Sequence, residues 1–122
     1  MIKQFFDEQS SSFTYLVTSQ EQKAFLVDPV LDNNKIYQDF ISQHSLTLSF
    51  ILETHTHADH VTGSGTLNDI YGCKIYCGLS SNSKNIETVI CITIKVNSYD
   101  AKMFISCLIY QNDYNSEVLK SF

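Results

Sequence analysis

A cluster of ionisable side chains directly after an apolar run constrains this sequence more than any other feature. Residues 48–52, Leu-Ser-Phe-Ile-Leu, predict a buried strand, and the chain then runs straight into residues 54–60, Thr-His-Thr-His-Ala-Asp-His. Three of the four histidines of the chain fall within these positions. Side chains two apart at the end of a strand point the same way, so His55 and His57 can converge on one ion.

Asp59 and His60 follow where the chain bends towards a predicted helix, so they can face a second ion or support the ligands of the first. Neutral imidazoles with a carboxylate suit Zn²⁺, Fe²⁺ or Mn²⁺. A loop at the end of a strand would hold the ion in a crevice that is open to substrate. We therefore predict a metal site formed by His55, His57, Asp59 and His60.

The elements around this loop alternate between strands and helices, which is an α/β pattern. The apolar pattern predicts strands at 13–18 and 24–27 joined by the polar residues 19–23, a helix capped at 32–34 and ending near His44, a strand at 48–52, a helix at 67–71 and a strand at 74–77. Gly72 is expected to end the second helix. His44 lies close to a helix C-terminus, where a cation is mildly favoured, and is interpreted as structural.

The composition changes after Gly78. All four glycines lie between positions 63 and 78, and the later residues are built largely from Ser, Asn, Ile, Lys and Tyr. Two apolar, β-prone runs at 88–96 and 103–110 can pair as a hairpin through residues 97–100. We therefore divide the chain into an N-terminal part, 1–78, and a divergent tail, 79–122.

Charge and composition exclude several classes of protein. A net charge of −5 argues against binding to nucleic acid or to an anionic membrane surface, and no apolar stretch approaches the roughly 20 residues that span a membrane. The N-terminus lacks the apolar segment of a signal peptide. The cysteines, two of them Cys73 and Cys77, lack zinc-ribbon or C-x-x-C spacing and are expected to be small buried residues rather than metal ligands. A reducing, cytoplasmic compartment fits this usage.

The order His-x-His-x-Asp-His after a strand resembles the signature of the metallo-β-lactamase superfamily. The longer run 54–65, Thr-His-Thr-His-Ala-Asp-His-Val-Thr-Gly-Ser-Gly, is similar to the persulfide dioxygenase version of this loop. Residues 13–17 and 26–31 also match the opening hairpin of that family. The resemblance covers residues 2–78, and it implies the N-terminal half of an αββα sandwich, an incomplete form of that α/β fold.

This resemblance implies a role for each residue of the loop. In a persulfide dioxygenase, His55 would be an iron ligand, and His57, Asp59 and His60 would shape the pocket around it. In the dinuclear hydrolases of the superfamily, His55 and His57 would hold one metal and Asp59, to which we also assign a catalytic role, would hold the other with His60. The implied cofactor is Fe²⁺, with Zn²⁺ as the alternative. Asp28 matches a family position that supports the loop by hydrogen bonds, although an Asp-Pro turn that ends a strand explains it equally well.

Three functions stay open on this basis. The first is a persulfide dioxygenase, which oxidises a small thiol persulfide such as glutathione persulfide. The second is a glyoxalase-II-like hydrolase that cleaves a thioester. The third is a non-catalytic metal-binding fragment, or a chain that pairs with a copy of itself or a second chain that supplies further ligands.

The downstream part of the sequence favours an incomplete site. The superfamily completes its site with later ligands, whereas no histidine follows His60 in this sequence. We therefore expect the isolated chain to be truncated and inactive, with residues 79–122 as a replacement tail from a frameshift or truncation, or as a hairpin that covers a sheet edge. Half of a sandwich is also expected to leave apolar strand faces exposed and the protein marginally stable.

Overall fold

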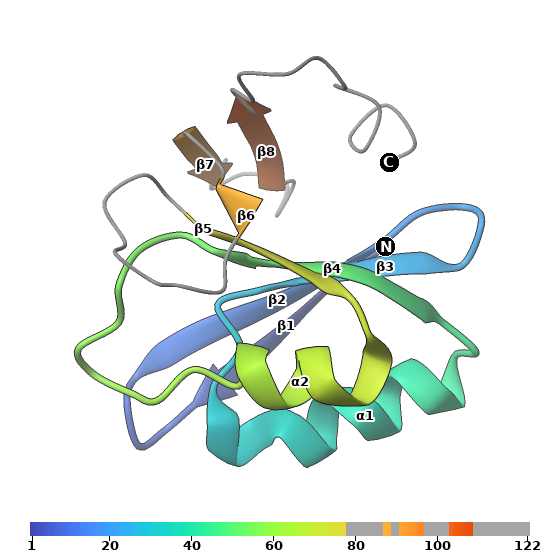
Figure 1. Cartoon of the computed structure of the whole chain (residues 1–122), viewed down its shortest axis with the longest axis horizontal. Coiled ribbons are helices and arrows are strands. Elements are labelled where there is room, and N and C mark those ends of the chain that lie inside the picture. The colour runs from blue at the N-terminus through green and yellow to red at the C-terminus, as the bar shows by residue number, and fades with distance from the viewer. Residues whose placement is uncertain (78–86, 89–90, 97–102, 109–122) are drawn as a thin grey trace.

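A six-stranded sheet with both described helices on one face forms the main body of this computed structural model (Figure 1), which describes residues 1–77, 87–88, 91–96 and 103–108. Its strands are β1 (Ile2–Asp7), β2 (Ser12–Thr18), β3 (Lys23–Val27), β4 (Thr47–Glu53), β5 (Lys74–Cys77) and β6 (Glu87–Thr88). The helices are α1 (Asn34–Gln43), which follows a 3-10 turn (Leu31–Asn33), and α2 (Ser64–Tyr71). Neither has the length and apolar character needed to cross a membrane.

The strand order in the sheet follows the order in the sequence, β1-β2-β3-β4-β5-β6. The pairs β1–β2 and β2–β3 are antiparallel, whereas β3–β4, β4–β5 and β5–β6 are parallel. Parallel neighbours need a crossover connection, and α1 and α2 provide the first two of these. Because β3 and β4 run in the same direction, the loops that leave them meet at one edge of the sheet.

The observed elements confirm the predicted α/β alternation and correct three details. The strand β1 was not predicted, because its sequence Ile-Lys-Gln-Phe-Phe-Asp does not alternate and most of its residues are exposed. The helix α2 begins at Ser64, three residues before the predicted start. The prediction placed the start too late because Ser, Gly and Thr in the first turn are poor helix formers. The cap predicted at 32–34 is wrong in its chemistry: Asn33 makes no side-chain cap and instead donates to Asp7. Gly72 does end α2, with a left-handed φ of 63°.

The core between the helices and the sheet is made of large apolar side chains from both layers. Strand and helix residues with no exposed surface meet there: Leu16, Leu26, Tyr37, Ile51 and Leu67. Burying each such aliphatic side chain stabilises the fold by about 1.5–3 kcal/mol. This layer therefore fixes α1 and α2 against the strands whose ends carry the histidine loop.

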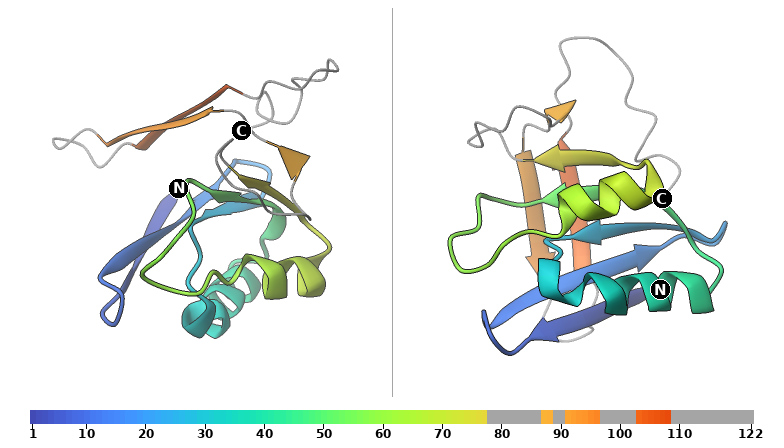
Figure 2. Two further views of the ribbon diagram at one scale, coloured as in Figure 1. Left: turned by 60° about the vertical axis from the view of Figure 1, so that its left-hand side comes forward. Right: turned by 60° about the horizontal axis from the view of Figure 1, so that its bottom comes forward.

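The opposite face of the sheet carries a second apolar cluster, formed by Phe25, Val27, Phe50, Leu52 and Tyr76. The rings of Phe25 and Phe50 stack with centroids 4.7 Å apart. These side chains are buried, whereas Phe13, which alternates with Tyr15 and Val17 on this face of β2, is 45% exposed. The predicted exposure of apolar strand faces therefore holds for the β1–β2 part of the sheet and is wrong for the cluster around Phe25. Two further strands, β7 (Cys91–Val96) and β8 (Met103–Leu108), form an antiparallel pair over this face, as Figure 2 shows from two directions.

The pair β7–β8 falls in the two runs that were expected to form strands. The predicted turn at 97–100 lies outside the described residues. The division of the chain at residue 78 stays a prediction.

A buried hydroxyl network joins α1 to β2 and to the turn after β3. The Thr14 hydroxyl donates to the Asp28 carbonyl at 2.7 Å, so it accepts from the Tyr37 hydroxyl, which lies 2.9 Å away. The Tyr37 oxygen in turn accepts from the Val30 N–H at 3.2 Å. Burial raises the pKa of Tyr37. This network satisfies polar groups that would otherwise be unpaired inside the core, next to the turn that leaves β3.

We predict that Tyr37→Phe lowers the free energy of unfolding by about 1–3 kcal/mol, because it leaves the buried Val30 N–H without an acceptor. Since the folded-state pKa of Tyr37 is raised, the stability it contributes is complete below about pH 10 and is lost as the pH rises towards the folded-state value. The difference between wild type and variant should therefore shrink above about pH 10 in urea unfolding curves. Tyr15→Phe is the control, because the Tyr15 hydroxyl contacts the exposed Gln4 side chain. An equal loss in both variants would contradict the network.

Candidate metal centre

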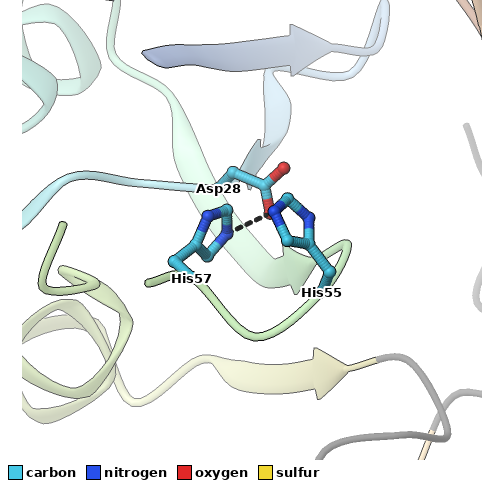
Figure 3. Close-up of side chains that lie close together, drawn as sticks. All are labelled: Asp28, His55 and His57. Carbon is cyan, nitrogen blue, oxygen red and sulfur yellow. Dashed lines mark hydrogen bonds and ion pairs between the residues drawn. The ribbon is translucent and has the colours of Figure 1, made fainter. Parts of the chain in front are cut away.

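The histidine loop, residues 54–63, leaves β4 beside the turn that leaves β3 (Figure 3). Backbone hydrogen bonds tie the two segments together. The Leu31 N–H donates to the Val61 carbonyl at 2.9 Å, and the Gly63 N–H donates to the Pro29 carbonyl at 2.7 Å. The far end of the loop is therefore held against the start of the segment that leads into α1.

Gly63 lies close to the side chain of Asn34 at the end of the loop. A Cβ atom on Gly63 would lie 2.1 Å from the Asn34 side-chain oxygen. The Asn34 amide also donates to the Gly63 carbonyl at 3.2 Å. A larger residue at position 63 would force the Asn34 side chain to move, so this contact favours glycine where the loop enters α2.

Asp28 lies at the centre of the hydrogen bonds that shape the loop. Its φ of 51° is in the left-handed region, which an aspartate tolerates better than most residues and which turns the chain sharply at the end of β3. Its carboxylate accepts from the Thr54 N–H at 2.7 Å, from the Thr54 hydroxyl at 2.6 Å and from His57 Nε2 at 3.0 Å. The supporting role that the resemblance implied for Asp28 is therefore visible in these contacts.

These contacts fix which nitrogen of each histidine carries a proton. A carboxylate only accepts hydrogen bonds, so His57 Nε2 is protonated where it meets Asp28, and its Nδ1 keeps a lone pair. The Thr54 hydroxyl gives its hydrogen to Asp28, so it accepts from His55 Nδ1 at 2.7 Å. His55 then keeps its lone pair on Nε2. The two neighbouring histidines thus offer different nitrogens to an ion.

Glu53 is a residue of the site that the sequence analysis missed. It is 5% exposed, one of its oxygens accepts hydrogen bonds from the Thr62 and Ser64 hydroxyls, and the other lies 3.2 Å from His57 Nε2. Burial raises the pKa of this carboxyl. The sequence did contain a signal for Glu53, because an acidic residue that ends an apolar strand directly before the histidine motif is unusual.

The ligand atoms of His57, Asp59 and His60 form one group, in which every pair lies within 4.8 Å. Asp59 Oδ1 is 3.3 Å from His60 Nδ1 and 3.8 Å from His57 Nδ1. The Asp59 side chain is 48% exposed, whereas that of His60 is 4% exposed. A hydrogen bond from its own backbone, followed by the nearby His60, lowers the pKa of Asp59. This carboxylate is therefore ionised and faces both solvent and the two rings.

A second group joins Asp28, His55 and His57, again within 4.8 Å (Figure 3). The four predicted residues thus fall into two groups that share His57, and His55 is not grouped with Asp59 and His60. We interpret Asp28 as orienting the loop rather than as a ligand, because its carboxylate already accepts three hydrogen bonds from protein donors. The assignment of ligands to an ion stays a prediction.

The residues fit a metal ion on two counts. His60 Nε2 is buried and has no hydrogen-bond partner among the described residues, which is costly for a polar atom unless something else contacts it. The donor set of His57, His60 and Asp59, two imidazoles with an ionised carboxylate, is the type that binds Zn²⁺ or Fe²⁺.

A cleft of about 190 Å³ opens beside the second half of the loop. Asp59, His60 and Val61 line it together with the β1–β2 turn and the segment before α1. A small molecule in this cleft would lie beside Asp59 and His60.

The other candidate residues lie apart from these two groups. His44 ends α1, where its ring stacks on Phe40 and its Nδ1 lies 2.9 Å from the Phe40 carbonyl. Cys73 and Cys77 are buried, as predicted, and neither belongs to a group of ligand atoms in the described part of the chain. Burial raises the pKa of the Cys73 thiol.

Comparison with known protein families gives a match to the metallo-beta-lactamase superfamily over residues 8–81. This range contains the histidine loop, Asp28 and both described helices. It also accounts for the arrangement of the sheet and helices as part of that fold.

Two curated relatives indicate which branches of the superfamily are similar. The human protein "Persulfide dioxygenase ETHE1, mitochondrial" is 40% identical over 76 residues, which cover 61% of this chain and 30% of that protein. The "Hydroxyacylglutathione hydrolase" of Bdellovibrio bacteriovorus is 36% identical over 76 residues, which cover 62% of this chain and 29% of that protein. The chain thus spans about 30% of the length of these relatives.

Among solved structures, "Crystal structure of ETHE1 from Myxococcus xanthus" superposes with a TM-score of 0.67 and 31% sequence identity. The match covers 71% of this chain and 40% of the other. The fold described above is therefore a partial form of the metallo-β-lactamase fold, as the sequence predicted.

We predict that Asp28→Asn weakens Zn²⁺ binding about 10- to 100-fold, the usual loss when a residue that orients metal ligands is changed. The new amide group would face the Thr54 and His57 donors and disturb the protonation pattern of both histidines. Competition with a chromophoric chelator measures the affinity, and Asp69→Asn, an exposed change on α2 with the same loss of charge, is the control. Equal affinities in the two variants would contradict an orienting role, and complete loss of binding would identify Asp28 as a ligand instead.

Proposed function

Because this chain belongs to the metallo-β-lactamase superfamily, we propose that its loop binds a metal ion and serves the chemistry of a persulfide dioxygenase acting on a small thiol persulfide. The observation that carries this proposal is the set of imidazole lone pairs left by the hydrogen-bond network, including the buried, unpartnered Nε2 of His60. The 40% identity with the human persulfide dioxygenase supports the choice of reaction.

The proposed ligands are His55, His57, Asp59 and His60, of which His57, Asp59 and His60 lie close enough together in this structure to share one ion. An iron(II) ion bound there would supply open coordination positions and electrons for reaction with dioxygen. The protein's own contribution is orientation, because Asp28 holds the ring of His57 directly and that of His55 through Thr54.

The proposed reaction converts a thiol persulfide, dioxygen and water into a thiol and sulfite: RSSH + O₂ + H₂O → RSH + HSO₃⁻ + H⁺. The sulfur–sulfur bond breaks and the outer sulfur becomes bonded to three oxygens. The two sulfur atoms together lose four electrons, and dioxygen takes these up. We place the persulfide in the cleft beside Asp59 and His60, where Asp59 is an exposed group that can contact it or hold a proton.

A second candidate function is hydrolysis of a thioester, as in glyoxalase II. The specific observation in its favour is that the ligand atoms fall into two adjacent groups, so that His55 and His57 could hold one ion and Asp59 and His60 a second. The 36% identity with a hydroxyacylglutathione hydrolase points the same way. In that case Zn²⁺ is the expected ion.

We further propose that the chain alone holds its ion weakly and turns over no substrate. Within residues 1–77 the fourth histidine, His44, lies at the end of α1 and cannot add to the ligand set. A facial site of two histidines and one carboxylate also needs a particular geometry with open positions. A second copy or another chain that supplies ligands would complete the site.

Metal analysis of the purified protein distinguishes these functions. One iron per chain together with oxygen uptake on addition of glutathione persulfide would support the dioxygenase, and two zinc ions with thioester cleavage would support the hydrolase. Metal below one ion per chain without turnover is the outcome that we expect for the chain alone. His55→Ala should reduce the metal content further, whereas His44→Ala, a matched change outside the site, should not. Stoichiometric, tightly held metal in His55→Ala would contradict the proposed ligand set.

A further inference from the structure

The turn between β1 and β2 reaches the histidine loop, and the metal ligands proposed above do not explain this contact. Ser12, the first residue of β2, places its hydroxyl 3.3 Å from His60 Nδ1, although the two residues are 48 positions apart in the sequence. We propose that Asp7, Ser10 and Ser12 are positioning residues, which form a hydrogen-bond relay that fixes the ring and the protonation pattern of His60. The consequence for metal binding rests on the proposed function, whereas the relay itself does not.

The direction of each hydrogen bond in the relay follows from its first member. The Asp7 carboxylate only accepts, so the Ser10 hydroxyl donates to it at 2.6 Å. The Ser10 oxygen, 2.5 Å from that of Ser12, therefore accepts from the Ser12 hydroxyl. The Ser12 oxygen is then left to accept from His60 Nδ1, which must carry a hydrogen.

The start of the relay is itself held firmly. Asp7 also accepts from the Ser10 N–H at 2.8 Å and from the Asn33 amide at 2.9 Å. The hydrogen bonds from Ser10 lower the pKa of Asp7, so this group is a carboxylate at neutral pH. Because Asp7 and Ser12 also face each other in the β1–β2 register, the turn cannot move relative to Asp7 without breaking strand pairing.

The far end of the relay meets a ring that has little freedom. The His60 side chain is 4% exposed, and Asp59 Oδ1 is a second acceptor 3.3 Å from its Nδ1. Both acceptors demand a hydrogen on Nδ1, which leaves Nε2 as the lone pair that lacks a partner among the described residues. If a cation engages Asp59, Ser12 is the acceptor that remains for His60.

The relay repeats the arrangement found at His55, the first histidine of the loop. There, the Asp28 carboxylate acts through the Thr54 hydroxyl on His55 Nδ1. In both cases a carboxylate outside the loop acts through serine or threonine hydroxyls and frees Nε2 to bind an ion. Outer partners of this kind change metal affinity about 10- to 100-fold when they are removed from their ligands.

The first experiment determines the protonation pattern of His60 in the metal-free, full-length chain by long-range ¹⁵N–¹H NMR. We expect a protonated Nδ1 in the wild type. In Asp59→Ala, where Ser12 is the remaining acceptor, the same pattern should persist, and in the double variant Asp59→Ala/Ser12→Ala it should give way to a mixture. A protonated Nε2 in the wild type would overturn the relay, as would an unchanged spectrum in the double variant.

The second experiment measures Zn²⁺ affinity by chelator competition. Ser12→Ala and Asp7→Asn should each bind about 10- to 100-fold more weakly than wild type. Ser12→Thr, which keeps the hydroxyl, should retain wild-type affinity. Ser11→Ala, an exposed change in the same turn, is the matched control. Wild-type affinity in Ser12→Ala would overturn the positioning role. A wild-type chain that shows the Nδ1 pattern but binds no metal would refute the proposed function and leave the relay supported.

Discussion

The Asp28 carboxylate at the end of β3 is the interaction on which the histidine loop depends. It accepts from the Thr54 backbone, from the Thr54 hydroxyl and from His57 Nε2, so one acidic group fixes where the loop begins and which nitrogens two histidines present. This is possible because β3 and β4 are parallel and adjacent, which brings their ends together at one edge of the sheet. The left-handed backbone of Asp28 directs its side chain towards the loop instead of continuing the strand.

The remaining contacts of the loop make this arrangement rigid. Backbone hydrogen bonds join the far end of the loop to Pro29 and Leu31, and Gly63 packs so closely on Asn34 that a larger residue would displace the Asn34 side chain. Beneath them, the Tyr37 network fixes the same turn from the side of the core. The site therefore stands on the buried layer between the sheet and α1, and changes in that layer are transmitted to the loop through the turn after β3.

The sequence predicted the parts of this site that depend on local spacing. The position of β4, the histidine loop and the end of α2 at Gly72 follow from residues that are close together in the chain. By contrast, the contact between Ser12 and His60, like the clustering of Glu53 with Asp28, depends on how strands pair and on which side chains become buried. The strand β1 was missed for the same reason, because an exposed edge strand is specified by its pairing with β2 more than by its own pattern. Family resemblance identified Asp28, and the hydrogen bonds of its carboxylate favour an orienting role over ligation.

The orientation of the histidines and the completeness of a metal site are separate properties in this chain. The hydrogen bonds that orient His55 and His57 come from Thr54 and Asp28, and His60 meets Ser12 and Asp59, so the rings do not need an ion to hold their positions. Preorganised ligands lose little conformational freedom on binding, which favours metal affinity even when few ligands are present. Catalysis additionally requires a particular number of ligands around open positions. A chain built in this way can therefore bind an ion at a well-ordered site and still depend on further ligands for turnover.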